Sequence, residues 1–89
     1  MLPEQILGAM KTYFADFKEP EELRDFERIR AADLIEDSMD AVTFVMHLED
    51  KTGRHIPMSQ AAGLTGLTFQ ELARQLAAGE MGVASPKAA

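Results

Sequence analysis

Cysteine is absent, so a serine activated by one of the two histidines is the first candidate for covalent chemistry in this sequence. A serine nucleophile needs a histidine base within hydrogen-bonding reach. Ser38 and His47 lie in a segment that we expect to be one helix, where about 1.5 Å of rise per residue places them roughly 13 Å apart. A direct contact is therefore excluded. We predict no catalytic residue and no enzymatic activity.

Metal binding is the other chemistry that these residues could support. A metal site needs three or four converging ligands, and only Glu49 and Asp50 stand near His47 and His55 in the sequence. The lack of cysteine also excludes zinc–thiolate sites and disulfides. We therefore expect both histidines on the surface and no metal site.

The charge of the chain is concentrated in one window. The formal net charge is −6, and all of this excess comes from residues 16–40, which hold ten acids and four bases. Such a balance argues against nucleic-acid binding and against docking on an anionic membrane, since both depend on Lys and Arg. The acidic window is either a solvated connector or a face that guides basic partners.

Apolar residues spaced by three and four predict the helices that position these side chains. Principal helices are expected over residues 3–17, from Asp37–Ser38 to Gly53, and from a capping box at Thr68–Glu71 to Gly79. A short helix is expected at residues 59–64, and another inside the long connector 18–37. No segment shows the alternation of a strand, so the predicted fold is all-α.

The length of 89 residues predicts one small domain. We assign the domain to residues 1–80 and a flexible tail to residues 81–89, which are rich in small residues. No apolar run approaches the roughly 20 residues of a membrane span, and the first residues lack the pattern of a signal peptide. We expect a monomer in the cytoplasm.

Ser38 stands where the acidic connector meets the start of the second principal helix. One role for it is to cap that helix through its hydroxyl. The other is to be displayed for modification, since the free N–H groups of a helix start favour an attached phosphate. The neighbouring Asp37 and Asp40 would oppose that phosphate, but they would suit recognition by a basic modifying enzyme.

This region resembles the acyl carrier proteins. The residues that carry the resemblance are Asp33-Leu34-x-x-Asp37-Ser38-Met39-Asp40-Ala41-Val42-x-x-Val45-Met46-x-Leu48-Glu49-Asp50, followed by Gly53 and Ile56-Pro57. The resemblance covers about residues 3–78. It implies a bundle of three principal helices and a short third helix, with a long loop between the first and second helices.

The resemblance also implies the roles of individual residues. Ser38 would receive 4′-phosphopantetheine from coenzyme A, so that the missing thiol arrives with the cofactor and carries an acyl group as a thioester. Partners would be a phosphopantetheinyl transferase and acyl-loading and acyl-processing enzymes with basic docking patches. The residues expected to meet them are Asp37, Met39, Asp40, Val42, Met46 and Asp50. The residues expected to line an acyl pocket are Phe44, Val45, Leu48 and Ile56.

Four departures from the family pattern suggest a specialised member. Ile35 replaces a common glycine, Thr43 replaces a common acid, and Thr52 stands where an aromatic residue is frequent. The segment from Met58 to Gln70 carries no charge, although the corresponding region is often acidic in the family. A different choice of partners or cargo is the expected consequence.

Other functions stay open from the sequence alone. The cargo of a carrier could belong to fatty-acid, polyketide or related biosynthesis, or be an aminoacyl or peptidyl group. A different class of protein is an unmodified helical interaction module with the same fold, in which Ser38 is only a helix cap. Transfer of phosphopantetheine to Ser38 would separate these classes.

Overall fold

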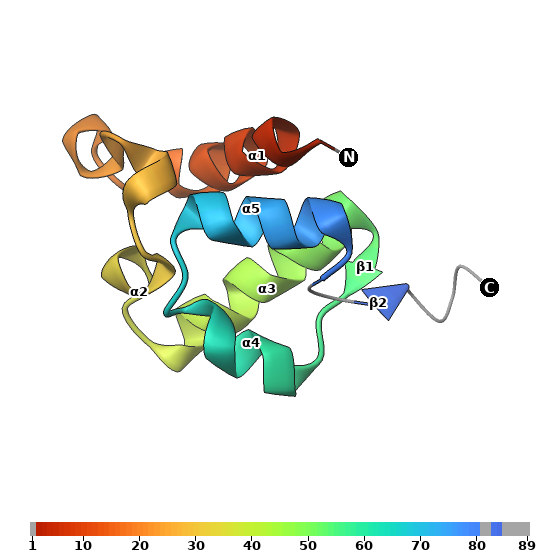
Figure 1. The fold of residues 1–89 in the computed structure, drawn as a ribbon. Coiled ribbons are helices and arrows are strands. Elements are labelled where there is room, and N and C mark those ends of the chain that lie inside the picture. The colour runs from red at the N-terminus through yellow and green to blue at the C-terminus, as the bar shows by residue number, and fades with distance from the viewer. Residues whose placement is uncertain (1, 81–82, 85–89) are drawn as a thin grey trace.

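The computed structural model describes residues 2–80 and 83–84, with only the backbone described for residue 58 and for the last pair. The described chain is mostly helical, as predicted from the sequence. Its elements are α1 (Pro3–Ala15), the 3-10 helices η1 (Pro20–Leu23) and η2 (Phe26–Arg28), α2 (Ala31–Leu34), α3 (Ser38–Thr52), β1 (Arg54–His55), α4 (Met58–Leu64), α5 (Phe69–Ala78) and β2 (Val83–Ala84). Figure 1 shows α1 and α5 side by side, with α3 and α4 beyond α5.

The core forms where α1, α3 and α5 present apolar faces to one another. The fully or almost fully buried side chains of these helices are Ile6, Met10, Phe14, Phe44, Leu48, Phe69, Leu72, Ala73 and Leu76. Their spacing of three and four residues in each helix explains why one face is buried. Helix α1 ends at Ala15, two residues earlier than predicted, and Phe17 is 56% exposed.

Four phenylalanines hold the centre of the core together. Phe26 stacks on Phe69 with ring centroids 4.2 Å apart and an interplanar angle of 11°. Phe14 contacts Phe26, Phe44 and Phe69 at centroid distances of 6.1, 5.2 and 5.4 Å. Aromatic pairs of this kind contribute about 0.5–1.5 kcal/mol each beyond the area they bury. The cluster joins the first connector to three helices.

The connector between α1 and α3 is more ordered than the single short helix that the sequence predicted. It contains η1, η2 and α2, and buries Leu23, Phe26 and Leu34. Its backbone is also bonded to the segment before α5. Ala31 N–H donates to the Leu67 carbonyl at 2.9 Å, and Phe69 N–H donates to the Ile29 carbonyl at 3.0 Å. The acidic connector is therefore part of the packed domain.

The helix ends follow the predicted caps. Thr68 Oγ1 accepts the N–H of Glu71 at 3.2 Å, while a Glu71 carboxylate oxygen accepts the N–H of Thr68 at 3.0 Å. Gly53 and Gly79 end α3 and α5 with φ of +69° and +77°, a left-handed conformation that glycine adopts without strain. These predictions are confirmed.

A two-residue antiparallel pair of strands, β1 with β2, was not predicted. His55 pairs with Val83 and Arg54 with Ala84. Strands this short leave no alternation to detect, which is why the sequence showed none. Of the predicted tail 81–89, residues 83–84 form β2 and the other positions lie outside the described residues. None of the helices in the described part of the chain is long and apolar enough to cross a membrane.

Candidate functional site

Ser38 is the first residue of α3, and its hydroxyl is not the helix cap. The preceding residue, Asp37, is the N-cap, and its Oδ1 accepts the backbone N–H of Asp40 at 2.9 Å. Ser38 is exposed, and its hydroxyl makes no hydrogen bond to any other described residue. The capping role that the sequence left open for Ser38 is therefore wrong. The hydroxyl stands free at the tip of the helix.

The turn before Ser38 is held by one contact on its core side and one on its solvent side. Ile35 is only 8% exposed and belongs to the core, and its φ of −91° is open to any residue. Isoleucine, which stands where acyl carrier proteins commonly have glycine, therefore fits this turn without strain and adds an apolar contact. On the outer side, Lys18 Nζ and Glu36 Oε1 form an ion pair at 3.2 Å. These contacts fix the connector residues that lead directly into Ser38.

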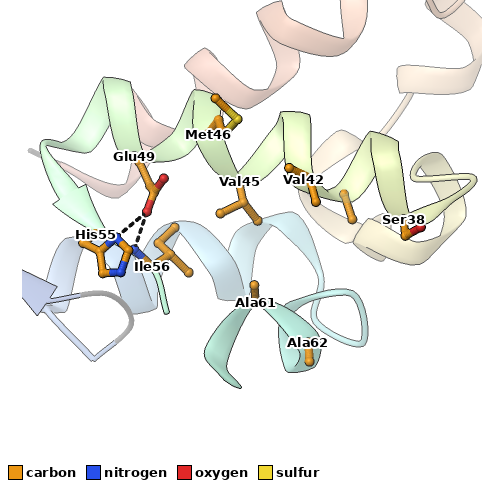
Figure 2. A pocket seen from close by; sticks show the side chains of 10 residues that line it. Ser38, Val42, Val45, Met46, Glu49, His55, Ile56, Ala61 and Ala62 are labelled. Carbon is orange, nitrogen blue, oxygen red and sulfur yellow. Dashed lines mark hydrogen bonds and ion pairs between the residues drawn. The ribbon is translucent and has the colours of Figure 1, made fainter. Parts of the chain in front are cut away.

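A groove of about 340 Å³ begins at Ser38 and follows α3 towards its carboxyl end (Figure 2). Its wall on α3 is made by residues spaced by three and four, which places them on one face of the helix. The opposite wall comes from Ile56 and from α4. The lining residues are Ser38, Ala41, Val42, Val45, Met46, Glu49, His55, Ile56, Ala61 and Ala62.

The dimensions of the groove suit a small apolar ligand. Ser38 and Glu49 are separated by eleven residues of helix, or about 16 Å of rise. The volume is at the lower end of the range of about 300–1,000 Å³ that ligand pockets span. Ala61 and Ala62 keep the wall on α4 low, so the groove stays open between the two helices (Figure 2).

A polar pair occupies the end of the groove opposite Ser38. Glu49 Oε2 accepts the backbone N–H of Ile56 at 2.8 Å and lies 2.9 Å from His55 Nδ1 (Figure 2). The side chains of Glu49 and His55 are 28% and 54% exposed. His55 is thus on the surface, as predicted, but it has a partner. The pair also attaches the 54–57 connector to α3.

His47 does not lie on the surface as predicted. It is half-buried, and its ring centroid is 4.7 Å from that of Tyr13 on α1. Its Nε2 atom is buried and has no hydrogen-bond partner among the described residues. Tyr13 itself has a raised pKa, first because burial disfavours the phenolate and second because of the charge of Asp40. Neither side chain lines the groove.

The predicted acyl-pocket residues divide between the groove and the core. Val45 and Ile56 line the groove, whereas Phe44 and Leu48 are fully buried and do not line it. Phe44 contacts Phe14 and Phe69 instead. The lining residues that were not predicted as site residues are Ala41, Glu49, His55, Ala61 and Ala62. Extending the three-and-four spacing from Ser38 along α3 would have found Glu49, but no signal in the sequence marks the residues of α4.

The predicted partner-binding residues are all exposed on or beside α3. Met39, Val42 and Met46 are exposed to 74%, 44% and 62%, which is high for large apolar side chains. Asp37, Asp40 and Asp50 are exposed beside them. Val42 and Met46 also line the groove. The described residues contain no group of three or more acids or histidines that could hold a metal ion.

Comparison of the chain with protein-family models, with curated proteins and with solved structures finds no match. The function is therefore inferred from the geometry around Ser38.

Proposed function

We propose that this chain is an acyl carrier protein, a non-enzymatic shuttle that is modified on Ser38. The observation that carries the proposal is the pairing of a free, exposed serine hydroxyl with an apolar groove that starts at the same residue. A serine that only capped α3 would accept a first-turn N–H with its hydroxyl, but Asp37 accepts that N–H instead. The resemblance of residues 33–57 to the acyl carrier proteins supports the same function.

The residues around Ser38 fit a 4′-phosphopantetheine group. The hydroxyl is accessible, the start of α3 offers free N–H groups to a phosphodiester, and the groove accepts an apolar chain next to it. When bound, the group supplies the thiol on which an acyl chain is carried as a thioester. The protein supplies the serine that anchors the group, the face of α3 that docks on partners and the groove that shelters the acyl chain.

Attachment requires a partner that supplies the base. Ser38 Oγ would bond to the phosphorus on the pantetheine side of coenzyme A, the pyrophosphate bond would break, and adenosine 3′,5′-bisphosphate would leave. The hydroxyl proton must go to a base, and no carboxylate or imidazole of the described chain is hydrogen-bonded to Ser38. A phosphopantetheinyl transferase therefore provides the base and positions coenzyme A.

The exposed face of α3 suits brief docking on basic enzymes. Met39, Val42 and Met46 supply apolar contact, and the acids beside them attract basic patches. Charges at this degree of exposure are screened by salt. Association should therefore weaken as ionic strength rises, which lets a carrier leave each enzyme after delivery.

The test is the transfer reaction. The protein is incubated with coenzyme A and a phosphopantetheinyl transferase of broad specificity, and its intact mass is measured. Wild type is expected to gain the mass of one phosphopantetheine, Ser38→Ala to gain none, and Ser59→Ala to behave like wild type. Ser59 is a matched control, because it is also an exposed serine in the first turn of a helix.

Two results would contradict the proposal. Modification of Ser38→Ala would place the attachment elsewhere. Failure of several transferases to modify the folded wild type would favour an unmodified interaction module with this fold.

A further inference from the structure

The groove has different chemistry at its two ends. Ser38 is at one end, Glu49 and His55 are at the other, and Figure 2 shows the apolar residues between them. Those intermediate residues are Ala41, Val42, Val45, Met46, Ile56, Ala61 and Ala62. None of them is charged, so Glu49 and its partner His55 set the electrostatics inside the groove. A chain that enters from the Ser38 end therefore meets a carboxylate at its far end.

The carboxylate of Glu49 keeps one oxygen for a ligand. Both of its polar contacts with the described chain are made by Oε2, which accepts the N–H of Ile56 at 2.8 Å and lies 2.9 Å from His55 Nδ1. Oε1 has no partner among the described residues. A carboxylate oxygen accepts hydrogen bonds and cannot donate them, so it favours a donor at the end of the ligand. It repels a second carboxylate and gains nothing from a methyl group.

The partial exposure of this end favours a cationic donor. The side chain of Glu49 is 28% exposed and that of His55 is 54% exposed, so an ammonium group here keeps part of its hydration. The size of the groove limits the chain. One water takes about 30 Å³ of liquid, so a groove of 340 Å³ holds on the order of ten non-hydrogen atoms.

We propose that the preferred cargo of this groove is a medium-length acyl chain that carries an amino group at its far end, with Glu49 as the residue that recognises that group. This inference rests on the proposed function, because it names the cargo that Ser38 would present. It identifies Glu49 as a specificity-determining residue and His55 as the residue that orients its carboxylate.

The experiment compares three cargoes on the whole protein. Octanoyl, ω-aminooctanoyl and ω-carboxyoctanoyl groups are loaded from their coenzyme A thioesters, and intact mass confirms attachment to Ser38. The rate at which hydroxylamine cleaves each thioester then measures how far the groove shelters the acyl chain from solvent. The ω-amino cargo should be cleaved about tenfold more slowly than the octanoyl cargo, since hydrogen bonds to charged groups are among the stronger ones. The ω-carboxy cargo should be cleaved fastest.

A variant pair assigns the effect to Glu49. Glu49→Gln should remove the advantage of the ω-amino cargo, whereas Glu80→Gln should keep it. Glu80 is an exposed acid that does not line the groove, so the second variant removes the same charge elsewhere. If Glu49→Gln does not fold, the ranking of the three cleavage rates on wild type still tests the inference. Equal cleavage of the ω-amino and octanoyl cargoes would overturn the inference.

Failure of the proposed function gives a different result. If intact mass shows no transfer to Ser38, the carrier function fails, and the groove is then tested with free octylamine and octanoate. A shift of the Ile56 amide resonance with octylamine alone would support the inference about the groove. Shifts of equal size with both compounds, or with neither, would overturn it.

Discussion

The carboxylate of Asp37 accepts the backbone N–H of Asp40 at 2.9 Å, and this hydrogen bond leaves Ser38 free of any capping role. Two adjacent residues at the start of α3 could each have been the cap. Because Asp37 takes the bond, Ser38 becomes the first helical residue with its hydroxyl towards solvent. This division of roles between neighbours leaves the Ser38 hydroxyl accessible, as the proposed modification requires.

The first prediction concerns that cap. Asp37→Ala should lower the free energy of unfolding by about 1 kcal/mol, the usual cost of losing an N-cap, whereas Asp37→Asn should stay within a few tenths. Urea unfolding followed by circular dichroism measures both. Asp33→Ala is the control, because Asp33 is an exposed acid of the same connector that makes no capping bond. An equal loss in Asp33→Ala and Asp37→Ala would show that charge, and not capping, matters at this turn.

The helices were predictable because their signals are local. The capping box of Thr68 and Glu71 and the glycines at positions 53 and 79 mark helix ends in the sequence itself. The ordered structure of the connector between α1 and α3 was not predictable in the same way. It depends on backbone bonds to distant residues, such as Ala31 to Leu67, which no local pattern records.

The candidate site was predictable along α3 and at Ile56, but not along α4. Helical spacing places Ser38, Val42 and Val45 on one face, so the sequence supports that wall. It also suggested Phe44 and Leu48 for the pocket, but these face the core. Packing between helices decides which apolar face of α3 meets α1 and α5 and which face meets α4. The contribution of Ala61 and Ala62 therefore required the structure.

The second prediction tests whether the connector is part of the core. Phe26→Ala should lower the free energy of unfolding by about 3–5 kcal/mol, because it removes a buried ring and leaves a cavity. Phe26 is 2% exposed and stacks on Phe69. Phe17→Ala is the matched control at 56% exposure and should cost about 1 kcal/mol or less. Urea unfolding measures both, and similar losses would mean that the connector is not anchored by Phe26.

The third prediction concerns acid stability. The pKa of Glu71 is lowered, first by the backbone N–H of Thr68 and second by its hydroxyl. A carboxyl group whose pKa is lower in the folded state stabilises the protein at pH values above its unfolded pKa of about 4.3. This stabilisation is lost as the pH falls through the folded pKa. The urea midpoint of wild type should exceed that of Glu71→Gln at pH 7, and the gap should close as the pH falls from about 5 towards 3. Glu80→Gln, which alters an exposed acid outside the capping box, is the control. A gap that stays constant with pH would contradict the assignment.

The fourth prediction uses the single tyrosine of a chain without tryptophan. The pKa of Tyr13 is raised by burial and, to a smaller degree, by Asp40. Absorbance titration of the phenolate should therefore give a midpoint above the ordinary value of about 10. Asp40→Asn should lower the midpoint and Asp50→Asn should leave it nearly unchanged. Circular dichroism at each pH confirms that the protein is still folded, and equal midpoints for wild type and Asp40→Asn would contradict the role of Asp40.

The last prediction tests whether the groove between α3 and α4 shelters the cargo of the proposed carrier. Ala62 lines the groove and is exposed, so a larger side chain there would occupy the groove without disturbing the core. Ala62→Leu should therefore change the urea midpoint little, but should raise the rate at which hydroxylamine cleaves an octanoyl group on Ser38. The octanoyl chain competes with the leucine for the same space, which is only about 340 Å³.

Gly63→Ala is the matched control for this substitution. A Cβ at position 63 meets no atom within 4 Å beyond its chain neighbours and its own helix backbone, and Gly63 does not line the groove. This variant should protect the cargo as wild type does and be slightly more stable, because alanine is the better helix former. If Ala62→Leu also protects the octanoyl group as wild type does, the chain must be sheltered elsewhere. Met39, which is 74% exposed next to Ser38 and does not line the groove, would then be the apolar side chain to test.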